Sequence, residues 1–222
     1  MNMCTLDKLR KITLDEDGKV SNLINSKDKN KSIIIEKFHS ITQWFSIFEK
    51  SYYNYRVCAI EKKSLDEQII ELSKYLTICN GILDTYKGLY LLACGLLNYK
   101  DTTPKDSFSK MRMNNKEHDD YFGITSFDDD NYFKHVRAIY GQHPTNLKYP
   151  ELRAFSSWPF KSKEPVTTNE SDLYTNIYFD ESENPLGYKF YFYYCDIEDY
   201  ISKLLKRIEN LVNKIYEEIY GL

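Results

Sequence analysis

Arg137 and His143 are the two residues of this chain whose types and spacing best suit chemistry, with five residues between them. Arginine is a permanent cation whose planar fork matches phosphate oxygens, and histidine can take or release a proton near neutral pH. Cleavage of RNA by internal attack needs a base near the ribose 2′-hydroxyl, an acid for the leaving oxygen and positive charge on the phosphorane. The pair therefore suits RNA cleavage without a metal ion.

The spacing of this pair places a condition on the backbone. On an unbroken α-helix, residues six positions apart differ by about 600°, so Arg137 and His143 would point about 120° away from each other. They can converge only if the helix ends between them. Gly141 and Pro144 are residues typical of a helix end, so the sequence permits convergence.

The region around the pair is basic, although the whole chain has a formal net charge of -3. From residue 131 to residue 163 there are six basic residues and one acidic residue, Glu151. Four residues of this region are candidates for RNA contact: Lys134, Asn146, Lys148 and Arg153. Four aromatic residues could stack on unpaired bases: Tyr140, Tyr149, Phe155 and Trp158. The alternative interpretation is that the aromatic residues belong to the core and the basic residues form a solvated rim.

The Arg137–His143 pair resembles the motif of the HEPN superfamily, in which a histidine follows an arginine after four to six residues late in a helical domain. By architecture, the resemblance covers roughly residues 64–222. It implies a ribonuclease that needs no metal and works as a homodimer, with both copies of the pair in one cleft. HEPN domains occur in bacterial toxins, abortive-infection proteins and CRISPR-associated ribonucleases, and some have become binding or dimerisation modules. This chain departs from many members at Ala138, where they have a polar residue.

Apolar residues at three- and four-residue steps predict helices over three long segments. The first runs from residue 33 to about residue 59, and the last follows Asp196 as its cap. A capping box, Ser64-Leu65-Asp66-Glu67, opens the second helix, which Gly81 and Gly88 are expected to bend or interrupt. A shorter helix should follow Asp128-Asp129-Asp130 and carry Arg137 near its end.

The rest of the chain is predicted to be less helical. Residues 101–127 lack an apolar period and are expected to form a long loop. Residues 145–170 contain three prolines and are expected to form a second irregular stretch. Two aromatic and β-branched runs flank a turn-forming stretch and predict a β-hairpin at about 172–195. The predicted fold is mainly α, a HEPN-like helical bundle with one β-hairpin before the C-terminal helix. We expect a single domain over 1–222, with N-terminal helices over 1–62 and a core over 64–222.

Composition narrows the class of protein. The five cysteines are scattered and never form a Cys-x-x-Cys pair, which favours reduced thiols in a cytosol over disulfides or a zinc site. No apolar run approaches the roughly 18 residues of a membrane span, and the N-terminal residues are polar. The sequence therefore predicts a cytoplasmic protein, for which no cofactor is expected.

Other motifs favour ordinary structural roles. His118-Asp119-Asp120 is similar to the His-Asp doublet of metal phosphohydrolases, but it falls in the predicted 101–127 loop without further ligands, which favours a solvated loop. Asp128-Asp129-Asp130 could bind a divalent cation, but consecutive acids point in different directions, so helix capping is favoured. The chain has no glycine-rich phosphate loop and no nucleophile elbow around Ser156-Ser157.

The leading hypothesis is a metal-independent endoribonuclease of HEPN type that acts as a toxin or phage-defence effector. Arg137 would hold the scissile phosphate, and His143 would act as general base or acid beside the copy in a partner chain. RNA, a second copy of the chain and an antitoxin or regulatory protein are the expected partners. The rival hypothesis is a non-catalytic helical module that binds a partner protein or RNA.

Overall fold

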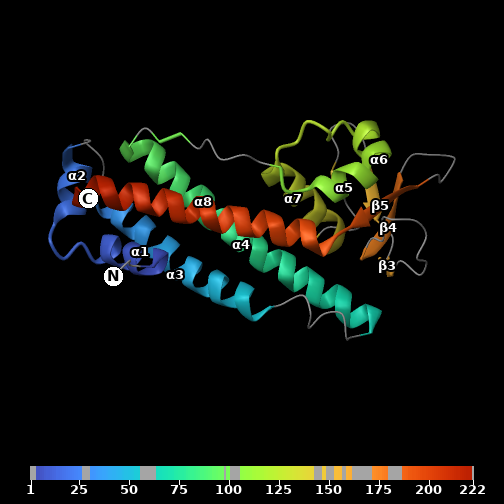
Figure 1. Ribbon diagram of the computed structural model, residues 1–222, viewed down its shortest axis with the longest axis horizontal. Helices are drawn as coiled ribbons and strands as arrows, with labels where there is room; N and C mark the ends of the chain where they lie inside the picture. Colours follow the sequence, from blue (N-terminus) through green and yellow to red (C-terminus); the bar gives the residue numbers. More distant parts are fainter. Residues whose placement is uncertain are drawn as a thin grey trace. The chain divides into compact units, whose positions relative to one another are not determined.

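The computed structural model describes most of the chain: residues 4–26, 31–55, 64–97, 99–100, 106–142, 147–148, 153–156, 159–161, 172–179 and 187–221. Helices dominate these residues, and a β-hairpin directly precedes the C-terminal helix α8 (Figure 1). The predicted fold class, mainly α with a hairpin before the last helix, is confirmed. No helix in the described ranges is long and apolar enough to cross a membrane.

The chain forms two compact units, each built from segments far apart in sequence. The first unit contains Met1–Asn54, Ile78–Pro104 and Ser202–Leu222, and the second contains Tyr55–Thr77 and Lys105–Ile201. The long helices α4 (Leu65–Leu97) and α8 (Tyr194–Tyr220) contribute residues to both units. The expected division into N-terminal helices and a core from residue 64 stays a prediction.

The first unit is helical and packs α1 (Thr5–Leu14) and α2 (Lys19–Ser26) with α3 (Lys31–Asn54). Its fully buried side chains include Leu9, Ile12, Ile24, Phe38 and Phe45. Helix α4 is continuous over Leu65–Leu97, so the expected interruption at its two central glycines is wrong. A Cβ atom at Gly81 would lie 2.5 Å from the ring of Phe48, and one at Gly88 would lie 3.1 Å from Ile41. These glycines allow close packing of helices α3 and α4.

The second unit contains the capping box at the start of α4, which the structure confirms. The backbone N–H of Ser64 donates to Glu67 Oε2 at 2.9 Å, and the backbone N–H of Glu67 lies 3.4 Å from Ser64 Oγ. The predicted long loop over 101–127 is wrong, because α5 (Ser109–Asn114) and α6 (Lys116–Tyr121) lie within it. Helices of six residues show no apolar period, and contacts with distant residues stabilise them.

A small antiparallel sheet completes the second unit. Strand β4 (Leu173–Phe179) pairs with β5 (Tyr188–Phe192), which confirms the predicted hairpin. Residues 145–170 were expected to be irregular, yet they contain β1 (Leu147–Lys148), β2 (Arg153–Ser156) and β3 (Phe160–Lys161). Strand β2 pairs with one end of β4 and β3 with the other, while β1 pairs with β2. Strands of two to four residues give too short a pattern to predict from sequence.

Helix α7 (Asp129–Arg137) carries the candidate arginine as its last residue. Tyr132, Phe133 and Val136 form its buried face. The chain then continues as a π-helical turn, η2 (Ala138–Gln142). The α-helix thus ends at Arg137, before Gly141, which has no positive φ angle, and the π-helical turn ends at Gln142. Pro144 lies outside the described residues, so the predicted stop at Gly141 and Pro144 stays a prediction. Asp196 lies inside the first turn of α8 instead of capping it, and it accepts the backbone N–H of Met111 at 2.7 Å.

Candidate functional site

The candidate site is centred on the side chain of Arg137, at the junction of α7 and the π-helical turn. The residue is half-buried, and its Nε atom is buried without a hydrogen bond to any described residue. Among the described carboxylates, none forms an ion pair with its guanidinium. The helix dipole stabilises a positive side chain at a helix C-terminus, so Arg137 lies at a favourable position. The dipole does not occupy the hydrogen-bond donors of the guanidinium. Arg137 therefore keeps N–H groups for a ligand.

The π-helical turn places Gly141 against the stem of Arg137. A Cβ atom at Gly141 would lie 3.5 Å from Arg137 Cγ and 4.0 Å from Ser73 Oγ. The hydroxyl of Ser73, from α4, donates to the carbonyl of Gly141 at 3.2 Å. Single turns of π-helix are frequent at functional sites, because they change the direction of the following chain. Nothing in the sequence around Ser73 indicated this contact, which joins residues 68 positions apart.

The other predicted site residues lie in several places. Lys134 is exposed on α7 three residues before Arg137, so the two cations share one side of the helix. Lys148 and Arg153 are register partners across β1 and β2. His143 and Asn146 lie outside the described residues. The structure thus brings the predicted residues together as two pairs, Lys134 with Arg137 and Lys148 with Arg153.

Two of the four candidate stacking residues, Tyr140 and Phe155, lie among the described residues. Tyr140 was a candidate for base stacking, but it is buried, and its hydroxyl donates to the carbonyl of Phe190 at 2.8 Å. Because burial disfavours the phenolate, the pKa of Tyr140 lies well above its usual value. The hydroxyl of Ser156 donates to the carbonyl of Ile139 at 3.1 Å, so two hydrogen bonds hold the π-helical turn against the sheet. Phe155 lies in β2, and Tyr149 and Trp158 lie outside the described residues.

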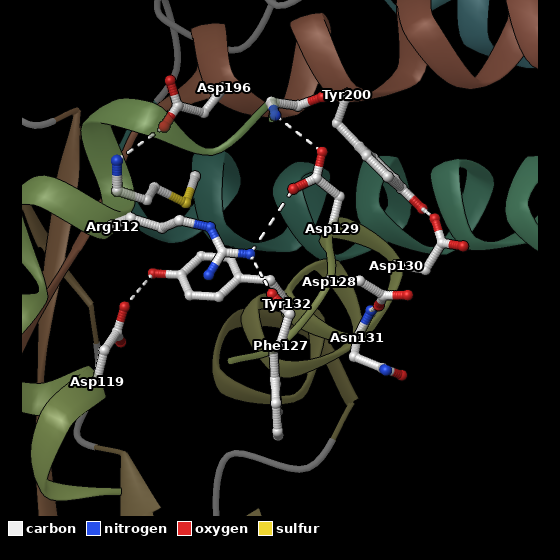
Figure 2. A network of polar contacts seen from close by, with 12 residues as sticks. Arg112, Asp119, Phe127, Asp128, Asp129, Asp130, Asn131, Tyr132, Asp196 and Tyr200 are labelled. Atoms are coloured by element: carbon white, nitrogen blue, oxygen red, sulfur yellow. Dashed lines mark hydrogen bonds and ion pairs between the residues drawn. The ribbon is translucent and has the colours of Figure 1, made fainter. Parts of the chain in front are cut away.

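The N-terminal end of α7 has a different arrangement, in which each of three consecutive acids accepts its own hydrogen bond (Figure 2). Asp128 caps the helix by accepting the backbone N–H of Asn131 at 2.9 Å. Asp129 accepts the backbone N–H of Ser107 at 2.8 Å. Asp130 accepts the hydroxyl of Tyr200 at 3.0 Å. The prediction that these carboxylates cap the helix and point in different directions is confirmed for Asp128, and the other two connect α7 to neighbouring segments.

Arg112 completes this network and shows how a structural arginine is held (Figure 2). Its Nη2 atom donates to the carbonyl of Phe127 at 2.7 Å and lies 3.7 Å from Asp129 Oδ1. Its guanidinium carbon lies 4.2 Å from the centre of the Tyr132 ring, a cation–π contact. Arg112 thus has a hydrogen bond, an ion pair and an aromatic face.

His118 and Asp119 lie inside this unit, so the prediction of a solvated loop at this doublet is wrong. Both are buried, with His118 Nδ1 2.9 Å from Asp119 Oδ1. The hydroxyl of Tyr132 donates to Asp119 Oδ2 at 3.0 Å (Figure 2). Burial lowers the pKa of His118 to about 3 and raises the pKa of Asp119 to about 7, although the hydrogen bond from Tyr132 and the charge of Arg112 oppose the rise.

This buried pair is therefore suited to holding α6 against α7 in a neutral state. With its raised pKa, Asp119 can stay protonated in the folded protein, and a protonated Asp119 would donate to His118 Nδ1 while it accepts from Tyr132. The ring of His118 packs 5.4 Å from that of His135 and 4.8 Å from that of Phe190. Within the described part of the chain, no group of three or more His, Cys, Asp or Glu side chains could hold a metal ion, and Cys4, Cys79, Cys94 and Cys195 are free thiols.

Comparison of the chain with protein families, with curated proteins and with solved structures found no match in any of the three. Function is therefore inferred from the geometry of Arg137 and its surroundings.

Proposed function

We propose that this protein is a metal-independent endoribonuclease of HEPN type, a cytoplasmic toxin or phage-defence effector that works as a homodimer. The observation that carries the proposal is the unsatisfied Nε–H of Arg137. This atom is buried with no described hydrogen-bond partner, whereas Nη2 of Arg112 in the same unit has a hydrogen bond and an ion pair. A buried donor without an acceptor is costly, and a phosphate oxygen would satisfy it.

The proposed mechanism assigns one task to each residue of the motif. Arg137 binds the scissile phosphate and stabilises the charge that develops on the phosphorane. His143 takes the proton of the 2′-hydroxyl, and the His143 of a second copy protonates the leaving 5′-oxygen. The 2′-oxygen–phosphorus bond forms while the 5′-oxygen–phosphorus bond breaks, which yields a 2′,3′-cyclic phosphate and a free 5′-hydroxyl. No cofactor takes part, and an antitoxin or regulatory protein would act by covering this surface.

The test is cleavage of labelled single-stranded RNA in EDTA by the wild type and by Arg137→Ala and His143→Ala. We expect cleavage by the wild type, with products that carry a cyclic phosphate, and a loss of about 100- to 1,000-fold in each variant. Arg10→Ala is the matched control, because Arg10 is an exposed arginine of the other unit paired only with Asp7 among the described residues. No cleavage by the wild type, or equal cleavage by all four proteins, would contradict the proposal.

The rival function is a non-catalytic module that binds a partner protein, and one observation favours it. Helix α3 exposes Ile33, Trp44, Ile47 and Tyr53, each with more than half of its surface accessible. Single exposed apolar residues are ordinary, but a tryptophan beside an isoleucine on one helix is typical of a contact surface. Trp44→Ser with Ile47→Ser should abolish a protein complex and leave RNA cleavage unchanged, whereas Arg137→Ala should have the opposite effect.

A further inference from the structure

The five-stranded sheet has an unusual composition for a chain with more acidic than basic residues. All the charged residues in its five strands are basic: Lys148, Arg153, Lys161 and Lys189. The remaining strand residues are mostly aromatic or aliphatic. A concentration of cations among aromatic residues is the composition of surfaces that bind single-stranded nucleic acid.

The hairpin β4–β5 turns one face towards the core and one away from it. Leu173, Thr175, Ile177, Phe190 and Phe192 alternate along the strands and are buried. Successive strand residues point to opposite faces, so the residues between them share the other face. They form what we term the tyrosine face: Tyr174, Asn176, Tyr178, Lys189 and Tyr191. Lys189 is exposed, and the other four are half-buried.

The geometry of the tyrosine face suits stacking. Tyr174 and Tyr191 are register partners, and their ring centres lie 6.4 Å apart. Lys189 Nζ lies 5.4 Å from the centre of the Tyr174 ring. The two rings are tilted by 46° to each other, so each ring can offer its own π face to a base, and the cation beside them can offer a positive charge to the phosphate that follows it.

A cavity of about 690 Å³ lies beside β5, continuous with this face. Its lining includes Lys116, Glu117, Tyr188, Lys189 and Tyr191. The amide of Asn115, also in the lining, accepts the backbone N–H of Tyr191 at 2.7 Å and donates to its carbonyl at 2.9 Å. These two hydrogen bonds fix the rim of the cavity to the strand. The volume lies within the range of pockets that hold a molecule of nucleotide size.

We propose that the tyrosine face and this cavity bind single-stranded RNA, with bases stacked on Tyr174 and Tyr191 and phosphates beside Lys189 and Lys116. The choice of RNA as the ligand rests on the proposed function. A single strand is required, because in a duplex the bases are already stacked on one another and cannot reach the rings. The hairpin thus acts as a substrate-docking surface separate from Arg137.

The experiment measures binding apart from cleavage. A fluorescent 2′-O-methyl single-stranded oligonucleotide, which lacks the attacking hydroxyl, is titrated with the full-length wild type and followed by anisotropy. The variants are Tyr174→Leu, Tyr191→Leu, Tyr191→Phe and Lys189→Met, with thermal unfolding recorded for each. Tyr53→Leu is the matched control, an exposed tyrosine of the other unit.

We expect each leucine variant to raise Kd roughly 5- to 100-fold, since base–aromatic stacking is lost. Tyr191→Phe and Tyr53→Leu should bind like the wild type, and Lys189→Met should weaken binding and reduce its salt dependence. The Phe variant keeps the ring and the strand, so it separates stacking from misfolding. Three results would overturn the inference. The leucine variants could bind as tightly as the wild type, or duplex could bind more strongly than single strand. Polyglutamate could also displace the oligonucleotide at equal charge. Cleavage without this binding pattern would overturn the inference and leave the proposed function standing. The binding pattern without cleavage would support the inference and contradict the proposed function.

Discussion

The two ends of helix α7 hold charged groups in opposite ways. At the N-terminal end, the carboxylates of Asp128, Asp129 and Asp130 each accept a hydrogen bond. At the C-terminal end, nine residues later, the buried Nε of Arg137 has no acceptor among the described residues. Buried polar groups in a stable framework are normally hydrogen-bonded, so an exception points to strain or to a ligand. Asp129 Oδ1 is also buried without a hydrogen bond among the described residues, but it lies 3.7 Å from Arg112 Nη2, whereas no described carboxylate forms an ion pair with Arg137. The N-terminal end is thus held by hydrogen bonds and an ion pair, and the C-terminal end is the one we propose as a binding site.

The same contrast separates two arginines of this unit. Arg112 has a carbonyl, a carboxylate and an aromatic ring around its guanidinium, as Figure 2 shows. Among the described residues, Arg137 Nε has no hydrogen-bond partner, and a Cβ atom at Gly141 would lie 3.5 Å from Arg137 Cγ. The same type of side chain thus has different surroundings at these two positions, and we expect the two positions to respond differently to substitution.

The largest effect is expected for Arg137→Ala, on activity. Loss of the fork should reduce RNA cleavage about 100- to 1,000-fold, because the charge on the phosphorane would lose its main stabilising group. The free energy of unfolding should change by less than about 1 kcal/mol, since the lost contacts are those of the stem alone. Cleavage assays and urea unfolding check the two parts. A large loss of stability with unchanged cleavage would reverse our assignment of the two ends.

Arg112→Ala should show the converse, a loss of stability. Removing a charged hydrogen bond, an ion pair and a cation–π contact should lower the free energy of unfolding by about 2–3 kcal/mol, as measured by urea unfolding. Cleavage per folded molecule should stay at the wild-type level. A variant as stable as the wild type would show that the network around Asp129 and Tyr132 holds without its arginine.

Asp119→Asn tests whether the network at the first end of α7 is neutral. Burial raises the pKa of Asp119 from 3.8 to about 7, so between these values the unfolded chain releases a proton that the folded chain keeps. The protonated carboxyl therefore contributes to the free energy of unfolding below about pH 4, and this contribution is lost as the pH rises towards 7. Asparagine does not titrate, and it can still accept from Tyr132 and donate to His118.

The stability of Asp119→Asn relative to the wild type should therefore increase by about 2 kcal/mol between pH 4 and pH 7. Urea unfolding at a series of pH values measures this difference. The lowered pKa of His118 makes stability change with pH in the opposite direction, and this effect cancels because both proteins contain His118. Asp119→Ala is the matched control: it should show the same slope with a lower stability throughout, because it lacks both hydrogen bonds. A difference that falls with pH would mean that Asp119 is ionised in the folded protein.

The smallest effect is expected for Gly141→Ala. The glycine has no positive φ, and the new Cβ would meet Arg137 Cγ and Ser73 Oγ at ordinary contact distances of 3.5 and 4.0 Å. The change should leave stability unchanged or raise it by up to about 1 kcal/mol, because alanine loses less backbone entropy. Thermal unfolding is the measurement. A clear loss of stability or of cleavage would show that the π-helical turn depends on its glycine.

The features predicted correctly depend on residues close together in the chain. The long helices follow from apolar periodicity, the start of α4 from Ser64 and Glu67, the cap of α7 from Asp128, and the hairpin from two aromatic runs around a turn. Each of these signals requires interactions over a few residues, which local sequence contains. The Arg137–His143 motif was visible for the same reason, and the unsatisfied guanidinium of Arg137 was not.

The tertiary structure decided the features that join distant residues. Helices α5 and α6 are too short to carry a periodic signal, and the contacts of Met111 with Asp196 and of Asn115 with Tyr191 stabilise them. The burial of His118 and Asp119 beside Tyr132 could not be predicted from a polar segment, because burial depends on what packs over it. Local sequence thus determined the helices, the caps and the hairpin, where hydrogen bonds and periodicity act over short separations. Only the tertiary structure determined which charges are satisfied, since acceptors such as Phe127 and Asp129 reach a cation from elsewhere in the chain.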